Sequence, residues 1–268
     1  MYSFVARKVG LALGSGSARG LAHIGVIKVL VENNIPIDYI AGCSMGSVVG
    51  AIYAAKKDIT YVENLVYSLD RKQALGLLDV APRQGFIKGE KIEKYLSDVI
   101  GTDNFYDLKI PFAAVATDLR NAQPVVFKDG SLIKAVRSSI SIPVAFKPME
   151  YGGKLLTDGG TAMPVPSPVA RAMGAGLVIA VDLNADYESV HSQSKFNVGD
   201  MVNVTLDLMC ANLAAYNDGM ADIVLKPKVG KVGWNDMFKP AAAIAEGERV
   251  MREALPQVEK FLHNSLWI

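Results

Sequence analysis

The chain has 268 residues, 50% of them hydrophobic, and a formal net charge of +1. This length allows one large or two small domains, and the near-neutral charge argues against a nucleic-acid partner, which would need a basic surface. The two cysteines exclude a disulfide framework or a cysteine-rich metal site. No apolar run is long enough to cross a membrane, and the one at 9–13 is too short for a signal peptide. We therefore expect a cytoplasmic protein that does not bind nucleic acid.

The first part of the chain predicts two units of strand, loop and helix. Residues 9–13 are apolar and predict a buried strand, which the small residues of 14–20 follow. A helix should come next, because apolar residues recur there at helical spacing: Leu21, Ile24, Ile27 and Val31. The second unit has a strand at 37–41, the sequence Gly-Cys-Ser-Met-Gly at 42–46, and a helix with the apolar residues Met45, Val48, Val49, Ile52 and Tyr53.

The remaining chain continues this alternation. Residues 70–88 suit a cap or flap, and the polar residues 184–199 predict a mobile loop. The alternation predicts an α/β fold, a three-layer α/β/α sandwich with a mostly parallel central sheet. We expect a single domain over 1–268, with its core at about 9–182 and with 183–268 completing it. Strands are predicted at 111–119, 125–127, 154–157, 177–181 and 223–225, and helices at 60–69, 90–100, 132–140, 168–173, 201–216 and 240–263.

The sequence Gly-x-Ser-x-Gly at 42–46 lies between a predicted strand and a predicted helix, which is the context of a nucleophile elbow. The turn is sharp, so Ser44 should adopt a strained backbone conformation for which Gly42 and Gly46 leave room. The helix start would direct free N–H groups at the site, where negative charge develops. Cys43 is expected to point into the core as a small apolar residue. The alternative is an ordinary Gly/Ser turn that packs a helix on a sheet.

A serine nucleophile needs a base, which is usually a histidine positioned by an acid. The chain has three histidines: His23 in the first predicted helix, His191 in the polar loop, and His263 near the C-terminus. None of them directly follows a predicted strand, where an α/β-hydrolase places its base. We interpret each as a surface or helix-face residue.

Three carboxylates, Asp118, Asp158 and Asp182, end predicted strands, and sites in open α/β sheets form at the carboxyl ends of strands. Their spacing alone does not show which of the three is the base. Asp158 is favoured because Gly159 and Gly160 let the backbone turn away from a crowded site. For the other two carboxylates, capping of the following loop is the simpler interpretation.

The Gly- and Ser-rich loop at the start of the chain could direct backbone N–H groups at an oxyanion. A loop of this kind could also bind a dinucleotide or a phosphate. Gly14 and Gly16, with Tyr53 and Lys57, even match parts of the short-chain dehydrogenase pattern. Those enzymes place the Tyr and Lys much further after the glycines, however, and the chain lacks the Gly-Lys-Ser/Thr of a P-loop.

Together these segments resemble the patatin-like phospholipase family, and in particular its bacterial acyl hydrolases. The resemblance runs from about residue 9 to residue 182 and rests on four blocks in the family's order and spacing. It implies that Ser44 is the nucleophile, that Asp158 is its base, and that no histidine takes part. It also implies an oxyanion hole formed by backbone N–H groups of the first loop, where Gly16 and Ser17 match. The four blocks are 14–20, 42–46, 137–143 with Phe146 and Pro148, and 158–160.

Other positions support the resemblance without a direct role in the reaction. Arg19 matches the family's basic residue in the first block, and the remaining matches are Gly14, Gly20, Gly42, Gly46, Gly159 and Gly160. The chain departs from the family at Ser15 and Ser17, where many members have glycine. Because a serine keeps its backbone N–H, the oxyanion hole should survive, but the approach of a bulky substrate should be narrower.

The resemblance implies a serine acyl-ester hydrolase that acts on a phospholipid, a lysophospholipid or a related lipid ester, without a metal or cofactor. Two alternatives stay open: an acyltransferase that uses the same acyl-enzyme, and a regulatory protein with incidental esterase activity. The apolar residues of 70–88, with Trp234, Met237 and Phe238, are candidates for an acyl groove or for transient contact with the inner face of the membrane. Ordinary packing is the alternative for these residues, and the oligomeric state stays open.

Overall fold

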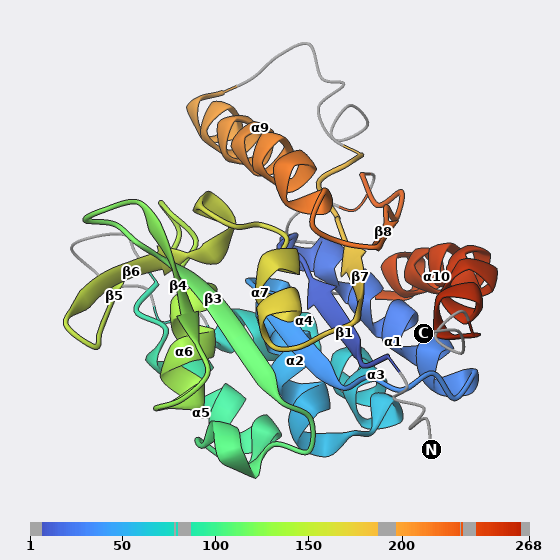
Figure 1. Ribbon diagram of the computed structural model, residues 1–268. Helices are drawn as coiled ribbons and strands as arrows, with labels where there is room; N and C mark the ends of the chain where they lie inside the picture. The colour runs from blue at the N-terminus through green and yellow to red at the C-terminus, as the bar shows by residue number, and fades with distance from the viewer. Residues whose placement is uncertain are drawn as a thin grey trace.

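The computed structural model describes residues 7–77, 79, 87–186, 197–230, 232 and 240–263. Its strands form one sheet in the order β5-β6-β3-β2-β1-β7-β8, with β4 paired to β3 outside that path. Helices cover both faces of the sheet (Figure 1). This arrangement confirms the predicted α/β fold, with a central sheet between helical layers.

The middle of the sheet is parallel. β1 (Val9–Leu13) lies between β2 (Tyr39–Cys43) and β7 (Leu177–Val181), with β3 (Phe112–Asp118) beyond β2 and β8 (Ile223–Leu225) beyond β7. β1 and β7 are buried at every position. Parallel strands that are covered on both faces have continuous apolar sequences, which is why the sequence predicted these two strands correctly.

Three antiparallel strands complete one side of the sheet. β4 (Gln123–Phe127) and β6 (Lys154–Asp158) both pair with β3, and β5 (Met149–Tyr151) pairs with β6. The sequence predicted β4 and β6 close to these positions, but it missed β5, because three residues are too few to show a periodic pattern. β2 lies two residues later than predicted, so Gly42 and Cys43 belong to the strand.

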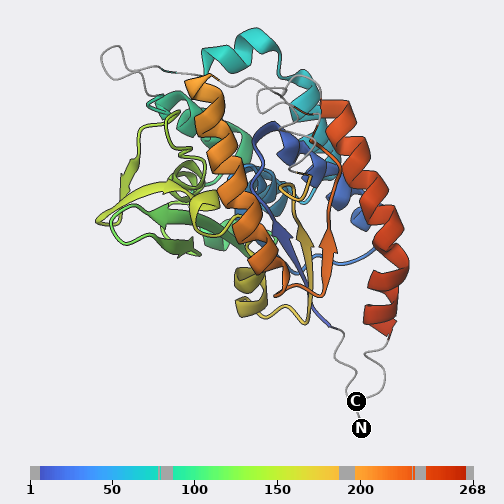
Figure 2. The same ribbon diagram turned by 90° about the horizontal axis from the view of Figure 1, so that it is seen from above.

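The two helical layers differ in the side chains that they meet. On one face, large aliphatic residues of the strands such as Leu11 and Ile40 pack against α1, α2, α3, α5, α6 and α10. On the other face, the strands present small residues such as Ala12 and Ala41, and α7 and Ala214 of α9 pack there. Figure 2 shows α9 crossing in front of the strands on this side. The described helical segments are η1 (Ser17–Leu21), α1 (Ala22–Glu32), α2 (Met45–Lys56), α3 (Ile59–Ser68), α4 (Arg71–Gly76), α5 (Glu90–Ile100), η2 (Phe105–Asp107), α6 (Leu132–Ser139), η3 (Gly159–Thr161), α7 (Ser167–Ala172), α9 (Val198–Asp218) and α10 (Pro240–His263).

Two segments that the sequence assigned to loops contain helix. The predicted flap includes α4, which begins with a capping box between Asp70 and Gln73. Helix α9 begins three residues earlier than predicted, because Asn197 and Asp200 form a second capping box. Most of the remainder of these two segments lies outside the described residues. Among the helices within the described ranges, none is both long and apolar enough to span a membrane.

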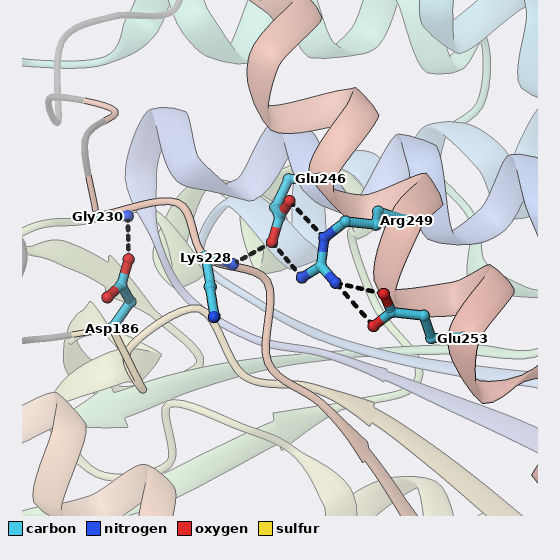
Figure 3. A network of polar contacts seen from close by, with 6 residues as sticks. All are labelled: Asp186, Lys228, Gly230, Glu246, Arg249 and Glu253. Carbon is cyan, nitrogen blue, oxygen red and sulfur yellow. Dashed lines mark hydrogen bonds and ion pairs between the residues drawn. The ribbon is translucent and has the colours of Figure 1, made fainter.

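Polar contacts fasten the C-terminal part of the chain to the sheet (Figure 3). After β8, the backbone N–H of Lys228 donates to Oε1 of Glu246 on α10 at 2.7 Å. The N–H of Gly230 donates to Oδ2 of Asp186, which follows β7, at 2.8 Å. Arg249, one turn further along α10, forms an ion pair with Glu246 at 2.6 Å. These contacts, and the pairing of β8 with β7, join the segment after β7 to the sheet; the single domain over 1–268 stays a prediction.

Helices α1 and α10 cross where each helix has a glycine. A Cβ atom on Gly25 would collide with the carbonyl oxygen of Ile244, and one on Gly247 would collide with the carbonyl oxygen of Ala22. The two backbones can therefore pack this closely only because both positions lack a side chain.

We predict that Gly25→Ala and Gly247→Ala each destabilise the protein. Alanine favours a helix over glycine by about 1 kcal/mol, but overpacking a close contact costs about 1–3 kcal/mol, so the net change should be destabilising. The measurement is the free energy of unfolding from urea titration. Gly76→Ala is the matched control, because no atom lies within 4 Å of a Cβ atom at that position. If Gly25→Ala were as stable as Gly76→Ala, the two helices would not pack in this way.

Candidate active site

Ser44 occupies a sharp turn between β2 and α2. β2 ends at Cys43 and α2 begins at Met45, and Ser44 between them has a φ of 53° and a ψ of −123°. Residues other than glycine rarely adopt this conformation, which is the strain predicted for a nucleophile elbow. A Cβ atom on Gly42 would touch the backbone of Gly46, and a Cβ atom on Gly46 would collide with the backbone of β1. Both glycines are therefore required by the turn.

The register of three strands brings Ser44 and Asp158 together. Along β3, Cys43 of β2 pairs with Val115, and Asp158 of β6 pairs with the next residue, Ala116. β2 runs parallel to β3 and β6 runs antiparallel, so the carboxyl ends of β2 and β6 meet end to end. The hydroxyl of Ser44, directly after β2, donates a hydrogen bond to Oδ2 of Asp158 at 2.6 Å.

The Asp158 carboxylate is buried, with only 5% of the residue exposed. Its second oxygen, Oδ1, accepts a hydrogen bond from the N–H of Gly160 at 2.8 Å, so Oδ2 is left facing Ser44. Burial raises the pKa of Asp158 from 3.8 to about 6, although the hydrogen bonds from Ser44 and Gly160 act to lower it. The carboxylate is therefore mostly ionised at neutral pH, yet is a stronger base than an exposed aspartate.

The block at 137–143 holds both residues of this pair. Ser139 accepts a hydrogen bond from the N–H of Ser44 at 2.9 Å and donates its own proton to the carbonyl of Val115 at 2.6 Å. The carbonyl of Ser141 accepts a hydrogen bond from the N–H of Asp158 at 3.0 Å. The sequence identified this block by resemblance alone and assigned it no role, because side-chain contacts between distant segments leave no local pattern.

Arg137 supports the same block from inside the protein. Its side chain is fully buried and donates to Oγ of Ser141 at 2.7 Å and to the carbonyl of Lys88 at 2.7 Å. The guanidinium also lies 4.9 Å from the ring centre of Phe146, which belongs to the same block. Arg137 therefore connects the residues beside the Ser44–Asp158 pair to the end of the predicted flap.

The first loop carries the candidate oxyanion hole. The N–H groups of Gly14 and Ser15 donate to the carbonyls of Val181 and Pro164, at 3.1 and 2.8 Å. Within the described part of the chain, we find no acceptor for the N–H groups of Gly16 and Ser17. Ser17 has a φ of 48°, a conformation that favours glycine, which agrees with the family's frequent glycine at this position.

His23 forms a hydrogen bond with this loop and not with Ser44. Its Nε2 lies 2.8 Å from the carbonyl oxygen of Gly14, so this nitrogen carries the proton and donates it. Complete burial lowers the pKa of His23 to about 4, so the ring is neutral at neutral pH. No hydrogen bond joins His23 to Ser44 or Asp158 within the described ranges.

The other sequence candidates lie in different surroundings. Asp118 accepts a hydrogen bond from the N–H of Arg120 at 3.0 Å, and Asp182 accepts one from the N–H of Asn184 at 2.8 Å. Both are therefore loop caps, as predicted. His263 is exposed at the end of α10. The remaining candidates fall outside the described residues: His191, Trp234, Met237 and Phe238.

Helix α9 reaches the site from a part of the chain to which the sequence assigned no role. Its Cys210 thiol donates to the carbonyl of Gly160 at 3.3 Å, and its Asp207 forms an ion pair with Arg19 at 2.8 Å. Burial raises the pKa of the Cys210 thiol to about 12 and that of Cys43 well above its usual value. Both thiols therefore stay protonated at neutral pH, and Cys43 is a buried core residue, as predicted. Among the described residues, no three His, Cys, Asp or Glu side chains form a group that could hold a metal ion.

Comparison with known proteins finds relatives among phospholipases and proteins of the NTE family. Residues 11–171 match the family model described as patatin-like phospholipase. The chain is 44% identical over 178 residues to an uncharacterized NTE family protein of Mycobacterium tuberculosis, covering 66% of this chain and 49% of that protein. It is 34% identical over 187 residues to the human patatin-like phospholipase domain-containing protein 6, covering 68% of this chain and 14% of that one. It is also 30% identical over 199 residues to the lysophospholipase NTE1 of Debaryomyces hansenii, covering 73% of this chain and 13% of that protein.

The chain thus spans about half the length of the mycobacterial relative and a small part of the two longer ones. Among solved structures, VipD from Legionella pneumophila is similar with a TM-score of 0.51, covering 94% of this chain and 67% of that one. At 13% sequence identity, this likeness concerns the fold alone.

Proposed function

The chain belongs to the patatin-like phospholipase family, and we propose that it hydrolyses lipid esters such as phospholipids or lysophospholipids through a Ser44–Asp158 dyad. The observation that carries this proposal is the 2.6 Å hydrogen bond between Ser44 Oγ and the buried carboxylate of Asp158, whose pKa burial raises to about 6. The names of the human and yeast relatives, a phospholipase domain protein and a lysophospholipase, support the substrate class.

The first half of the proposed reaction forms an acyl-enzyme. Oγ of Ser44 attacks the carbonyl carbon of the ester while its proton moves to Oδ2 of Asp158. The carbonyl oxygen becomes an oxyanion, which the N–H groups of Gly16 and Ser17 and the N-terminus of α2 stabilise. When the tetrahedral intermediate collapses, the bond to the leaving alcohol breaks and Asp158 returns the proton to that alcohol.

The second half releases the fatty acid. A water molecule attacks the acyl carbon and gives its proton to Asp158, and a second oxyanion forms in the same hole. Collapse then breaks the bond to Ser44, whose oxygen recovers the proton from Asp158. The carboxylate accepts and returns protons directly, so this scheme needs no histidine, and the raised pKa of Asp158 suits that task.

We predict that Ser44→Ala and Asp158→Asn each reduce turnover of a short soluble ester by about a thousandfold or more. The double variant should be little worse than either single one, because the two residues act as a unit. An active-site fluorophosphonate should label only the peptide that carries Ser44, as mass spectrometry can show. His263→Ala is the control and should keep wild-type turnover. A folded Asp158→Asn protein with near-normal turnover would refute the dyad.

The raised pKa of Asp158 also predicts two pH dependences. Because the base must be ionised, kcat/KM for a soluble ester should fall as the pH falls through about 6. Folding raises this pKa, so the folded state binds the proton more tightly than the unfolded chain, and stability should decrease as the pH rises from about 4 to 6. Asp158→Asn should therefore be inactive but at least as stable as the wild type at pH 8, with the advantage shrinking towards pH 4. An activity profile with no limb near pH 6 would argue against Asp158 as the base.

The outward face of α9 supports transient contact with a lipid surface. Its exposed side chains are largely apolar, and Asp207 is the only charged residue from position 201 to 217. The opposite face of α9 touches Arg19 and Gly160, so lipid bound to the outward face would contact the helix that packs against the proposed active site. The large apolar residues of α9 that are exposed are Val198, Met201, Leu208, Met209 and Tyr216.

We predict that the double change Met209→Glu and Tyr216→Glu weakens association with phosphatidylcholine vesicles by about tenfold or more, because charged side chains disfavour insertion of an apolar helix face. Sedimentation with vesicles measures this directly, and turnover of a soluble ester should not change. Tyr106→Glu is the control, since Tyr106 is 81% exposed in η2, before β3 and not on α9. Equal vesicle binding by the double variant and the control would contradict a role for α9.

A further inference from the structure

Helix α9 contacts both sides of the proposed active site from one of its faces. Oδ1 of Asp207 lies 2.8 Å from Nη2 of Arg19, in the segment that follows the oxyanion loop. Sγ of Cys210 lies 3.3 Å from the carbonyl oxygen of Gly160, two residues after Asp158. Residues three positions apart share a helix face, so α9 spans the gap between the two loops.

Arg19 transmits the contact to the oxyanion loop. Its backbone N–H donates to the carbonyl of Gly16 at 2.9 Å, and its Nε lies 3.4 Å from the same oxygen. The residue is only 5% exposed, so a guanidinium without a carboxylate partner would be a buried, uncompensated charge. The ion pair with Asp207 compensates this charge and holds the end of the Arg19 side chain against α9.

The contacts of Arg19 with the Gly16 carbonyl oxygen set the orientation of the Gly16–Ser17 peptide plane. In a trans peptide the carbonyl oxygen and the following N–H point in opposite directions. Fixing the Gly16 carbonyl on Arg19 thus directs the Ser17 N–H to the other side. Ser17 has a φ of 48°, a strained conformation that persists only where surrounding contacts hold it.

We propose that Asp207 is a positioning residue for the oxyanion hole, acting through Arg19 on the Gly16–Ser17 peptide. This inference rests on the proposed function, because it assigns the Ser17 N–H to the oxyanion of that reaction. Asp207 touches neither the substrate nor Ser44 in this role. It sets the direction of a donor that matters most when the tetrahedral intermediate forms, so its loss should affect kcat and not KM.

The test compares Asp207→Asn with the wild type on a short soluble ester. Removal of a single oxyanion-hole donor costs about 100- to 1,000-fold in kcat, so a misdirected donor should cost about 10- to 100-fold, with KM within about twofold. A trifluoromethyl ketone forms a tetrahedral adduct whose oxyanion occupies the hole, so its inhibition constant should rise by about the factor by which kcat/KM falls. Asp207→Glu, which keeps the charge, should restore part of kcat.

The control is Asp200→Asn, which removes the same charge from the same helix at a capping residue of α9, and it should keep wild-type kcat. An unchanged kcat in folded Asp207→Asn, a change in KM alone, or an equal loss in Asp200→Asn would overturn the proposal. If Asp207→Asn does not fold, Arg19→Lys replaces it as the test variant, because lysine keeps the charge but loses the Nε contact with Gly16. A folded Arg19→Lys protein with full kcat would overturn the proposal. Wild-type turnover by Ser44→Ala would instead refute the proposed function itself.

Discussion

β2 and β6 pair with the same edge of β3, because β4 occupies the other edge, so neither strand can extend past the point where they meet. The chain must leave the sheet abruptly at Ser44 and again at Gly159. The positive φ of Ser44 is the result of the first turn. At the second turn, a Cβ atom on Gly159 would collide with the backbone of Val115 and lie 2.9 Å from Sγ of Cys43. The same constraint that strains the backbone therefore brings the hydroxyl and the carboxylate within hydrogen-bonding distance.

The arrangement is costly for stability. Raising the pKa of Asp158 from 3.8 to about 6 corresponds to about 3 kcal/mol at neutral pH, and each strained φ, at Ser44 and Ser17, costs about 1–3 kcal/mol. Hydrogen bonds at the site offset part of these costs. The N–H of Ser44 donates to Ser139, and the N–H of Asp158 donates to the carbonyl of Ser141. A loss of stability of this kind is what the proposed function would require, because activity and stability commonly compete at an active site.

The elements with a local signal were predictable from the sequence. The buried strands, the elbow at Ser44 and the glycines after Asp158 all depend on near neighbours in the chain. The choice of Asp158 stays a prediction, and the structure places its carboxylate 2.6 Å from Ser44 Oγ. The reason for the choice was incomplete, since β6 runs antiparallel and not with the parallel strands. What the sequence missed depends on long-range pairing: Ser139 is 95 positions from Ser44, and Asp207 is 188 positions from Arg19. No periodicity or motif connects residues so far apart, and the resemblance to the family ended before α9.

The departure of this chain from the family at Ser15 has a consequence that only the structure gives. The sequence suggested a narrower path for bulky substrates, but Ser15 is buried, and its hydroxyl lies beside Gly160, two residues after Asp158. A Cβ atom on Gly160 would lie 3.3 Å from Ser15 Oγ, 3.1 Å from Asp158 Oδ1 and 3.4 Å from Cys210 Sγ. The first loop, the Asp158 carboxylate and α9 therefore converge on one glycine. A side chain at position 160 would therefore crowd Ser15 and the Asp158 carboxylate, which accepts the hydrogen bond from Ser44, while it would only touch Cys210 of α9.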